Sequence, residues 1–162
     1  MQTRISTLIG AAALLLSTGL TLAAPGEPGH SHKSFAAGEL GDPKKPIART
    51  IEVTMKETDD AKMLFEPNKV EIKRGEQVKF VIKKAGKTDH EFMLDSIPNN
   101  AKHKIAMEKN PDMEHDDPNG KRLAPSGSNE IVWRFTKAGT FEFACLIPGH
   151  NESGMHGTVV VK

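Results

Sequence analysis

The chain has 162 residues, a nearly balanced charge and a single cysteine. Lysine and arginine number 22 and aspartate and glutamate 21, which gives a formal net charge of +1 at pH 7. This balance argues against a nucleic-acid binder, because such a protein shows a basic excess or stripe. The length suits one compact domain with its own core.

The first 24 residues have the pattern of a secretory signal. Arg4 precedes an apolar stretch from Leu8 to Leu20, and small residues follow as far as Ala24. The stretch is too short to span a bilayer comfortably as a mature helix. We therefore expect residues 1–24 to be a signal peptide and the mature chain to be exported to the periplasm without a membrane span. A retained anchor is the alternative, since Pro25 directly follows the expected cleavage region.

The composition of residues 25–48 predicts a flexible tail. The segment is rich in proline, glycine and lysine and has few apolar side chains, so it cannot bury enough surface to offset the entropy of ordering. His30 and His32 form a His-x-His pair that can bind copper or zinc loosely. Two solvated histidines that bind no metal are the alternative.

Short apolar and β-branched runs with period two follow from about residue 50, separated by turn residues. They predict an all-β domain over residues 49–162, and many short strands with glycine and proline turns indicate a β-sandwich. The seven expected strands are 51–55, 65–72 with a break at Pro67 and Asn68, 77–83, 90–95, 130–135, 140–145 and 157–162.

The strand pattern fails between residues 96 and 129, which we interpret as an insertion. Residues 100–109 can form a short helix that ends before Pro111, because the residue preceding a proline disfavours helical geometry. A loop packed over one side of the sandwich is the simpler interpretation, and a second metal site is the alternative. Donors for such a site would be His103 and Met107, which share a helix face, together with Met113 and His115.

Cys145 is the only cysteine of a chain that is predicted to be exported, where thiols oxidise and pair. Without a disulfide partner it is either buried and inert or held by a metal as the thiolate. His150 and Met155 follow it at five-residue steps, and His90 stands at the start of an earlier predicted strand. One thiolate, two imidazoles and a weak axial thioether form the donor set of a trigonal copper electron-transfer centre. We therefore predict one type 1 copper ion at these four residues.

The sequence between the cysteine and the methionine favours a loop that folds back on itself. Cys145 ends a predicted strand, so its sulfur projects at one end of the sandwich. Pro148-Gly149 turns the chain back toward the sulfur, and Gly154 allows a second bend before the last strand. His156, directly after Met155, is expected on the surface, because adjacent side chains of an extended strand point in opposite directions.

The upstream histidine and the loop from Cys145 to Met155 resemble those of the cupredoxins, the small blue copper proteins that include plastocyanins, pseudoazurins and azurins. The resemblance covers roughly residues 50–162 and implies a Greek-key β-sandwich of about seven to eight strands. It implies that His90, Cys145 and His150 are equatorial copper ligands, with Met155 axial. It further implies that electrons pass through His150 within an apolar surface patch, to which Leu146, Ile147 and Pro148 would contribute.

Two roles remain open. The His-containing tail and the insertion resemble those of exported cupredoxins associated with bacterial copper tolerance. The first hypothesis is a periplasmic protein that cycles between Cu(II) and Cu(I), is linked to copper tolerance and docks to a periplasmic cytochrome, a copper oxidase or a copper-handling protein. The second is a copper-sequestering or copper-delivery protein with extra Cu(I) sites in the tail and the Met/His insertion.

Three other classes fit the residues less well, and we expect no enzyme. A copper oxidase or nitrite reductase couples such a centre to a second copper through histidines that flank the cysteine, but here the neighbours are Ala144 and Leu146. A structural zinc site normally uses only cysteine and histidine, which leaves Met155 unexplained. A Cys-His hydrolase needs a base and an orienting group around an accessible thiolate.

Phe92, Phe141 and Phe143 are expected in the core, near the copper shell.

Overall fold

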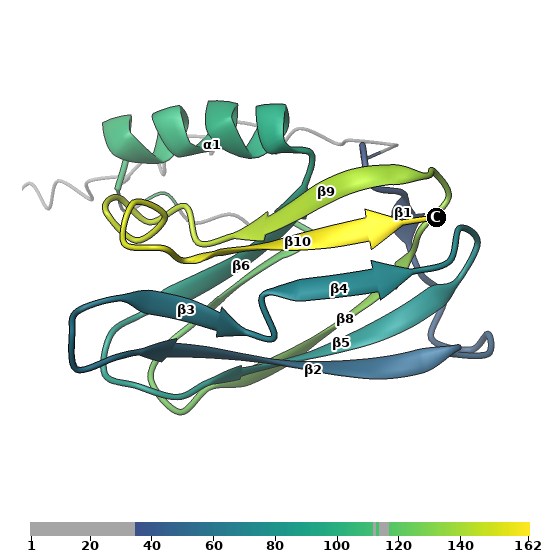
Figure 1. Ribbon diagram of the computed structural model, residues 1–162, viewed down its shortest axis with the longest axis horizontal. Helices are drawn as coiled ribbons and strands as arrows, with labels where there is room; N and C mark the ends of the chain where they lie inside the picture. The colour runs from purple at the N-terminus through teal and green to yellow at the C-terminus, as the bar shows by residue number, and fades with distance from the viewer. Residues whose placement is uncertain (1–34, 112, 114–116) are drawn as a thin grey trace, which may run out of the picture. The chain divides into compact units, whose positions relative to one another are not determined.

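The described part of the chain, residues 35–111, 113 and 117–162 of a computed structural model, contains ten strands in two sheets and one helix (Figure 1). The strands are β1 Glu39–Leu40, β2 Arg49–Glu57, β3 Met63–Glu66, β4 Lys69–Ile72, β5 Gln77–Lys84, β6 His90–Asp95, β7 Gly120–Leu123, β8 Ser128–Arg134, β9 Gly139–Ala144 and β10 His156–Val161; the helix α1 is Ile97–Lys109. The sheet orders are β1-β8-β5-β2-β3 and β4-β10-β9-β6-β7. The predicted all-β sandwich is confirmed.

The core lies between the two sheets because alternate side chains of each strand point inward. On β5, Val78, Phe80 and Ile82 are fully buried. From the other sheet, Phe92 stacks on Phe143 with ring centroids 5.3 Å apart and lies 5.6 Å from the ring of Phe80. The contact between Phe92 and Phe80 joins the sheets. Phe92 and Phe143 are both 0% exposed, which confirms core packing for two of the three phenylalanines expected there. Phe141 is also buried.

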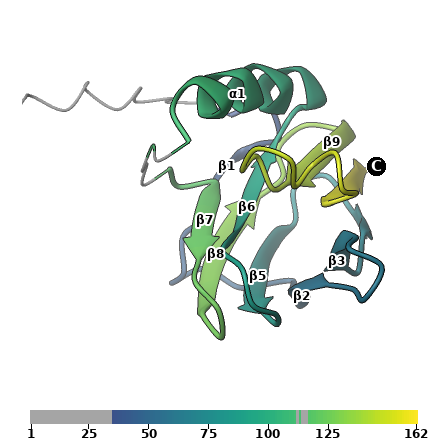
Figure 2. The same cartoon turned by 90° about the vertical axis from the view of Figure 1, so that its left-hand side faces the viewer.

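Strand β6 is buried on both of its faces, since α1 covers the outer face of its sheet (Figure 2). Phe92 and Leu94 belong to the core between the sheets. Met93 points the other way and packs in a separate cluster with Met107 of α1, and Met113 packs against its edge. We call Met93, Met107 and Met113 the methionine cluster. Ala144 and Leu146 complete this small apolar layer under the helix.

The segment 65–72 forms two strands in different sheets, where one interrupted strand was expected. β3 pairs with β2 in the first sheet, and β4 pairs with β10 in the second. The predicted break at Pro67 and Asn68 is therefore the point at which the chain crosses between the sheets. Proline lacks the N–H group that a continuous ladder requires.

The predicted flexible tail is wrong for residues 35–48. Phe35 and Ala37 are buried, and the ring of Phe35 meets Trp133 edge-on at 5.2 Å. Strand β1 then pairs with β8, and the Gln77 side chain binds both the N–H and the carbonyl of Asp42 at 2.8 and 2.9 Å. The averaged composition concealed these few anchoring residues. The predicted signal peptide and the pair His30 and His32 lie outside the described residues.

The predicted insertion contains the expected helix but also a strand that was missed. The helix begins earlier than predicted, because Ser96 caps it by accepting a hydrogen bond from the N–H of Asn99 at 3.3 Å. β7 pairs with β6, and β8 begins at Ser128, so the expectation of no strands over residues 96–129 is wrong. Only Leu123 is a large apolar residue in β7, and this is too little for a period-two signal. His115 lies outside the described residues.

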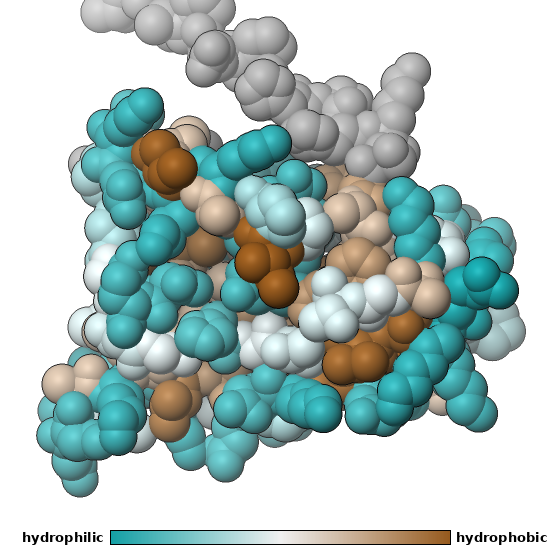
Figure 3. Space-filling view, turned by 45° about the horizontal axis from the view of Figure 1, so that its top comes forward, coloured by the Kyte–Doolittle hydropathy of each residue, from teal (hydrophilic) through white to brown (hydrophobic). Residues whose placement is uncertain are grey.

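The side that carries α1 is turned toward the viewer in Figure 3. Hydrophilic residues cover much of this face, and hydrophobic residues appear as separate spots. The exposed isoleucines of α1 are Ile97 and Ile105, at 53% and 51% exposure. Within the described ranges, no helix combines the length and the apolar character that a membrane crossing requires.

Candidate metal centre

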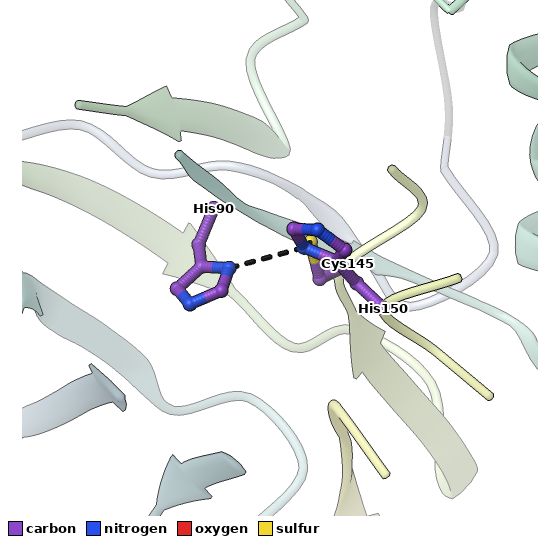
Figure 4. Close-up of side chains that lie close together, drawn as sticks. All are labelled: His90, Cys145 and His150. Carbon is purple, nitrogen blue, oxygen red and sulfur yellow. Dashed lines mark hydrogen bonds between the residues drawn. The ribbon is translucent and has the colours of Figure 1, made fainter. Parts of the chain in front are cut away.

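Three of the four predicted ligands meet at one end of the sandwich (Figure 4). One potential ligand atom from each of His90, Cys145 and His150 lies within 4.8 Å of the other two. Nδ1 of His90 lies 3.1 Å from Nδ1 of His150, and Sγ of Cys145 lies 3.4 Å from that same His150 atom. Among the described residues this is the group of His, Cys, Asp and Glu side chains whose geometry suits a metal ion.

Strand pairing brings the distant histidine to the loop. β6 pairs with β9 in antiparallel register, with Met93 opposite Ala144. His90, the first residue of β6, therefore lies beside the chain that leaves β9 at Cys145. The N–H of Glu91 donates to Sγ of Cys145 at 3.3 Å, which fixes the sulfur against the start of β6.

The loop after Cys145 folds back as the sequence predicts. Gly149 and Gly154 have φ angles of 86° and 101°, a region that residues with a Cβ seldom adopt. The N–H of Met155, directly after the second glycine, donates to the carbonyl of His150, directly after the first, at 3.1 Å. The N–H of Cys145 donates to the carbonyl of Met155 at 3.0 Å, which closes the loop at its base.

Met155 is fully buried in the same core cluster as Cys145. Its backbone is hydrogen-bonded to Cys145 and His150, so it belongs to the same loop as two of the converging donor residues. Its role as an axial ligand stays a prediction. His156, the next residue, is exposed, as expected from the alternation of side chains.

Burial keeps the donor groups in their neutral forms. Loss of hydration lowers the pKa of His90 to about 4, with the nearby Lys84 ammonium acting in the same direction. Burial likewise lowers the pKa of His150. For Cys145, burial raises the pKa to about 12, although N–H groups of Glu91 and Ile147 oppose the shift. Two neutral imidazoles suit a metal ion directly, and the thiol must lose its proton to the metal.

The state of Cys145 is unfavourable for nucleophilic catalysis. A reactive cysteine is partly exposed and has a depressed pKa, whereas this thiol is fully buried and has a raised one. Soft sulfur and imidazole donors are the ones that copper accepts readily. The residues present therefore fit a copper ion.

Two carboxylates beside the centre were not anticipated from the sequence. Oε1 of Glu57, at the end of β2, lies 2.7 Å from Nε2 of His90. Glu91 is only 2% exposed and accepts a hydrogen bond from the N–H of Leu146 at 3.3 Å. No local pattern marks either residue, because their partners lie 33 and 55 positions away in the chain.

Hydrogen bonds keep Glu57 charged. Burial acts to raise its pKa, but the Thr88 hydroxyl, the Lys84 ammonium and the N–H groups of Lys87 and Thr88 outweigh it and hold the pKa of Glu57 well below its usual range. A carboxylate anion therefore stands directly behind His90.

The expected apolar surface patch is smaller than predicted. Leu146 is 1% exposed and packs toward the methionine cluster, so it contributes nothing to the surface. Ile147 is half-buried and Pro148 is exposed. The reason is alternation: Ala144 and Leu146 point to the helix side of the sheet, and Cys145 between them points to the core.

A two-sheet β-sandwich with a Cys/His/His donor group at one end is the architecture of a cupredoxin. The chain belongs to the plastocyanin/azurin family of copper binding proteins, whose family model matches residues 51–162.

Individual relatives agree with this assignment. Over 150 residues the chain is 44% identical to a protein of Rubrivivax gelatinosus named copper-resistant cuproprotein CopI, covering 86% of this chain and 88% of the relative. The Pseudomonas aeruginosa protein of the same name is 35% identical over 144 residues, covering 71% and 77%. Among solved structures, auracyanin B shares the fold with a TM-score of 0.61 at 20% identity, covering 78% of this chain and 96% of the auracyanin.

Proposed function

We propose that this protein is an exported electron carrier that holds one type 1 copper ion and serves copper tolerance. The observation that carries the proposal is the convergence of His90, Cys145 and His150 within 4.8 Å. Met155 would add the weak axial thioether. A bound copper ion supplies a one-electron couple between Cu(II) and Cu(I).

The protein contributes a rigid, dry surrounding for that couple. His90 and Cys145 are both 0% exposed, which keeps water away from the donors. The Glu91 N–H fixes the sulfur, and the backbone bond from Cys145 to Met155 closes the loop. Donors held in this way cannot rearrange much when the charge of the ion changes, and small rearrangement favours fast electron exchange.

Compartment and partners follow from other observations. The secretory pattern of residues 1–24 supports a periplasmic location. The relatives named copper-resistant cuproprotein support a role in copper tolerance. We propose a redox partner such as a periplasmic cytochrome or copper oxidase, docking near the half-buried His150 and the exposed Pro148. The proposed role needs no enzymatic activity of this chain.

Copper loading tests the proposal. We expect the purified mature protein to bind one Cu(II) per chain with an intense visible thiolate-to-copper absorption, and to lose this colour on reduction. Metal analysis, visible spectra and electron paramagnetic resonance measure these properties. A copper-loaded protein that lacks the visible band would contradict the proposed function. A purified protein that has no affinity for copper would contradict it as well.

A second candidate function is copper sequestration with an additional Cu(I) site. The observation that favours it is the methionine cluster, in which Met93 and Met107 are 2% and 1% exposed and Met113 packs against them. Thioethers are soft ligands that select Cu(I). Methionine also fills irregular core gaps without binding metal, so this cluster needs a direct test.

Cu(I) stoichiometry separates the two functions. If the cluster binds metal, the triple variant Met93→Leu, Met107→Leu and Met113→Leu loses one Cu(I) equivalent relative to the natural sequence, measured by competition with a chromogenic chelator. Such swaps conserve volume and each costs less than about 1.5 kcal/mol. The matched control is Met55→Leu, which changes a buried methionine of the main core. If the natural protein, the triple variant and Met55→Leu each bind a single Cu(I) equivalent, the cluster binds no metal and the carrier function is the one that remains.

A further inference from the structure

We propose that Glu57 is a positioning residue of the copper centre, which fixes the His90 ring for metal binding and lowers the reduction potential. The inference rests on the proposed copper site. It concerns a residue on β2, in the sheet opposite to the one that carries the ligands.

The two ring nitrogens of His90 face different groups. Nδ1 points to His150, 3.1 Å from its Nδ1, and is the atom available to a metal. Nε2 lies 2.7 Å from Oε1 of Glu57. The distance between these two atoms is that of a charge-assisted hydrogen bond. The N–H direction of Nε2 does not point well enough at Oε1 to complete that bond. A carboxylate behind a ligating histidine favours a proton on the rear nitrogen, orients the ring and raises the basicity of the ligand.

Glu57 is itself held in a cradle made by the turn between β5 and β6. Its Oε2 accepts from the N–H of Lys87 at 2.9 Å, and its Oε1 accepts from the Thr88 hydroxyl at 2.7 Å. Lys84 Nζ lies 3.0 Å from Oε1, with a side chain that is 0% exposed. A Cβ at Gly86 would stand 1.8 Å from Oε2, so the turn wraps closely around the carboxylate.

Glu57 is held by more hydrogen-bond donors than the carboxylate of an ordinary surface ion pair. Glu52, on the same strand, pairs with Lys83 at 2.7 Å, but both side chains are about half exposed and no other group fixes them. Glu57 instead accepts hydrogen bonds from three residues. Its negative charge lies next to Nε2 of His90, the ring nitrogen that is turned away from the other donor atoms. A charge in this place acts on the metal through the ring.

The sign of the effect on the potential follows from charge. An anion behind His90 stabilises Cu(II) more than Cu(I), so it lowers the potential. Lys84 is a cation in the same cluster and opposes this effect. Glu57→Gln should therefore raise the potential, and Lys84→Met should lower it. Outer-shell partners of ligating histidines typically contribute 10- to 100-fold in metal affinity. A 10-fold loss confined to Cu(II) corresponds to a rise of 59 mV for a one-electron couple.

The first experiment observes the histidine without copper. Long-range ¹H–¹⁵N spectra of the apo-protein should show His90 with its proton on Nε2, and Glu57→Gln should shift the ¹⁵N resonance of Nε2. The matched control is Glu52→Gln, which removes one carboxylate from the same strand and should leave the His90 resonances unchanged. A proton on Nδ1 of His90 in the natural protein would overturn the proposal.

The second experiment measures reduction potentials of the copper-loaded variants. We expect a rise for Glu57→Gln, a fall for Lys84→Met and no comparable change for Glu52→Gln. Equal potentials for Glu57→Gln and Glu52→Gln would overturn the inference while the visible band still supports the copper site. If Glu57→Gln does not fold, a Lys84→Met potential at or above the natural value would overturn the inference. Absence of the band in the natural protein would instead refute the proposed function.

Discussion

Cys145→Ser is expected to abolish the visible absorption of the copper-loaded protein. The band arises from charge transfer between a thiolate and copper, and Cys145 is the only cysteine in the chain. A serine hydroxyl is a hard, poorly ionised donor, so it cannot replace the sulfur for copper. The residual site would have two imidazoles, and we expect any bound Cu(II) to give the weak absorption and wide hyperfine splitting of an ordinary copper complex. Visible and electron paramagnetic resonance spectra measure the change.

His156→Ala is the matched control for this prediction. It removes an exposed imidazole one position after Met155, outside the converging donor group. We expect the control to keep the full band and the natural potential. Persistence of the band in Cys145→Ser would refute the ligand assignment.

Phe143→Ala is expected to destabilise the apo-protein by about 3–5 kcal/mol, the usual cost of deleting a buried phenylalanine. The ring is 0% exposed and stacks on Phe92. Phe65 of the opposite sheet meets it edge-on at 5.1 Å. The ring also covers Gly157, where a Cβ would lie only 2.2 Å from the Phe143 Cζ atom. Its removal would open a cavity between the two sheets, and urea unfolding measures the loss.

A helix residue provides the comparison. Ile105 is 51% exposed on α1, so Ile105→Ala should change the free energy of unfolding by no more than about 0.5 kcal/mol. If Phe143→Ala cost as little as this control, the contact of Phe143 with Phe65 would not help to hold the two sheets together.

The course of the loop from Cys145 to Met155 could be predicted because its information is local. Cys145, His150 and Met155 lie within eleven consecutive positions, and the two glycines that bend the chain stand between them. His90 could be added because it starts a short run with three consecutive apolar residues, Phe92 to Leu94, just beyond the Gly86 turn, and this run indicates a strand. The sandwich itself followed from period-two alternation, which depends on neighbours along the chain.

The features that were missed depend on contacts between distant segments. Glu57 resembles any charged residue at a strand end until folding brings it against His90. β7 has a single large apolar residue and owes its place to pairing with β6. Phe35 anchors residues 35–48 through Trp133, almost 100 positions away. Neither composition nor periodicity reports such pairings.

The hydrogen bond from the Cys145 N–H to the Met155 carbonyl closes the loop from Cys145 to Met155 at its stem. The stem is shared with the ladder of β9 and β10, which continues immediately beyond it at the pair Ala144 and His156. The scaffold thus ends where the loop begins. A change in the length or sequence of the loop tip therefore leaves the strand pairing of the sandwich beneath it intact.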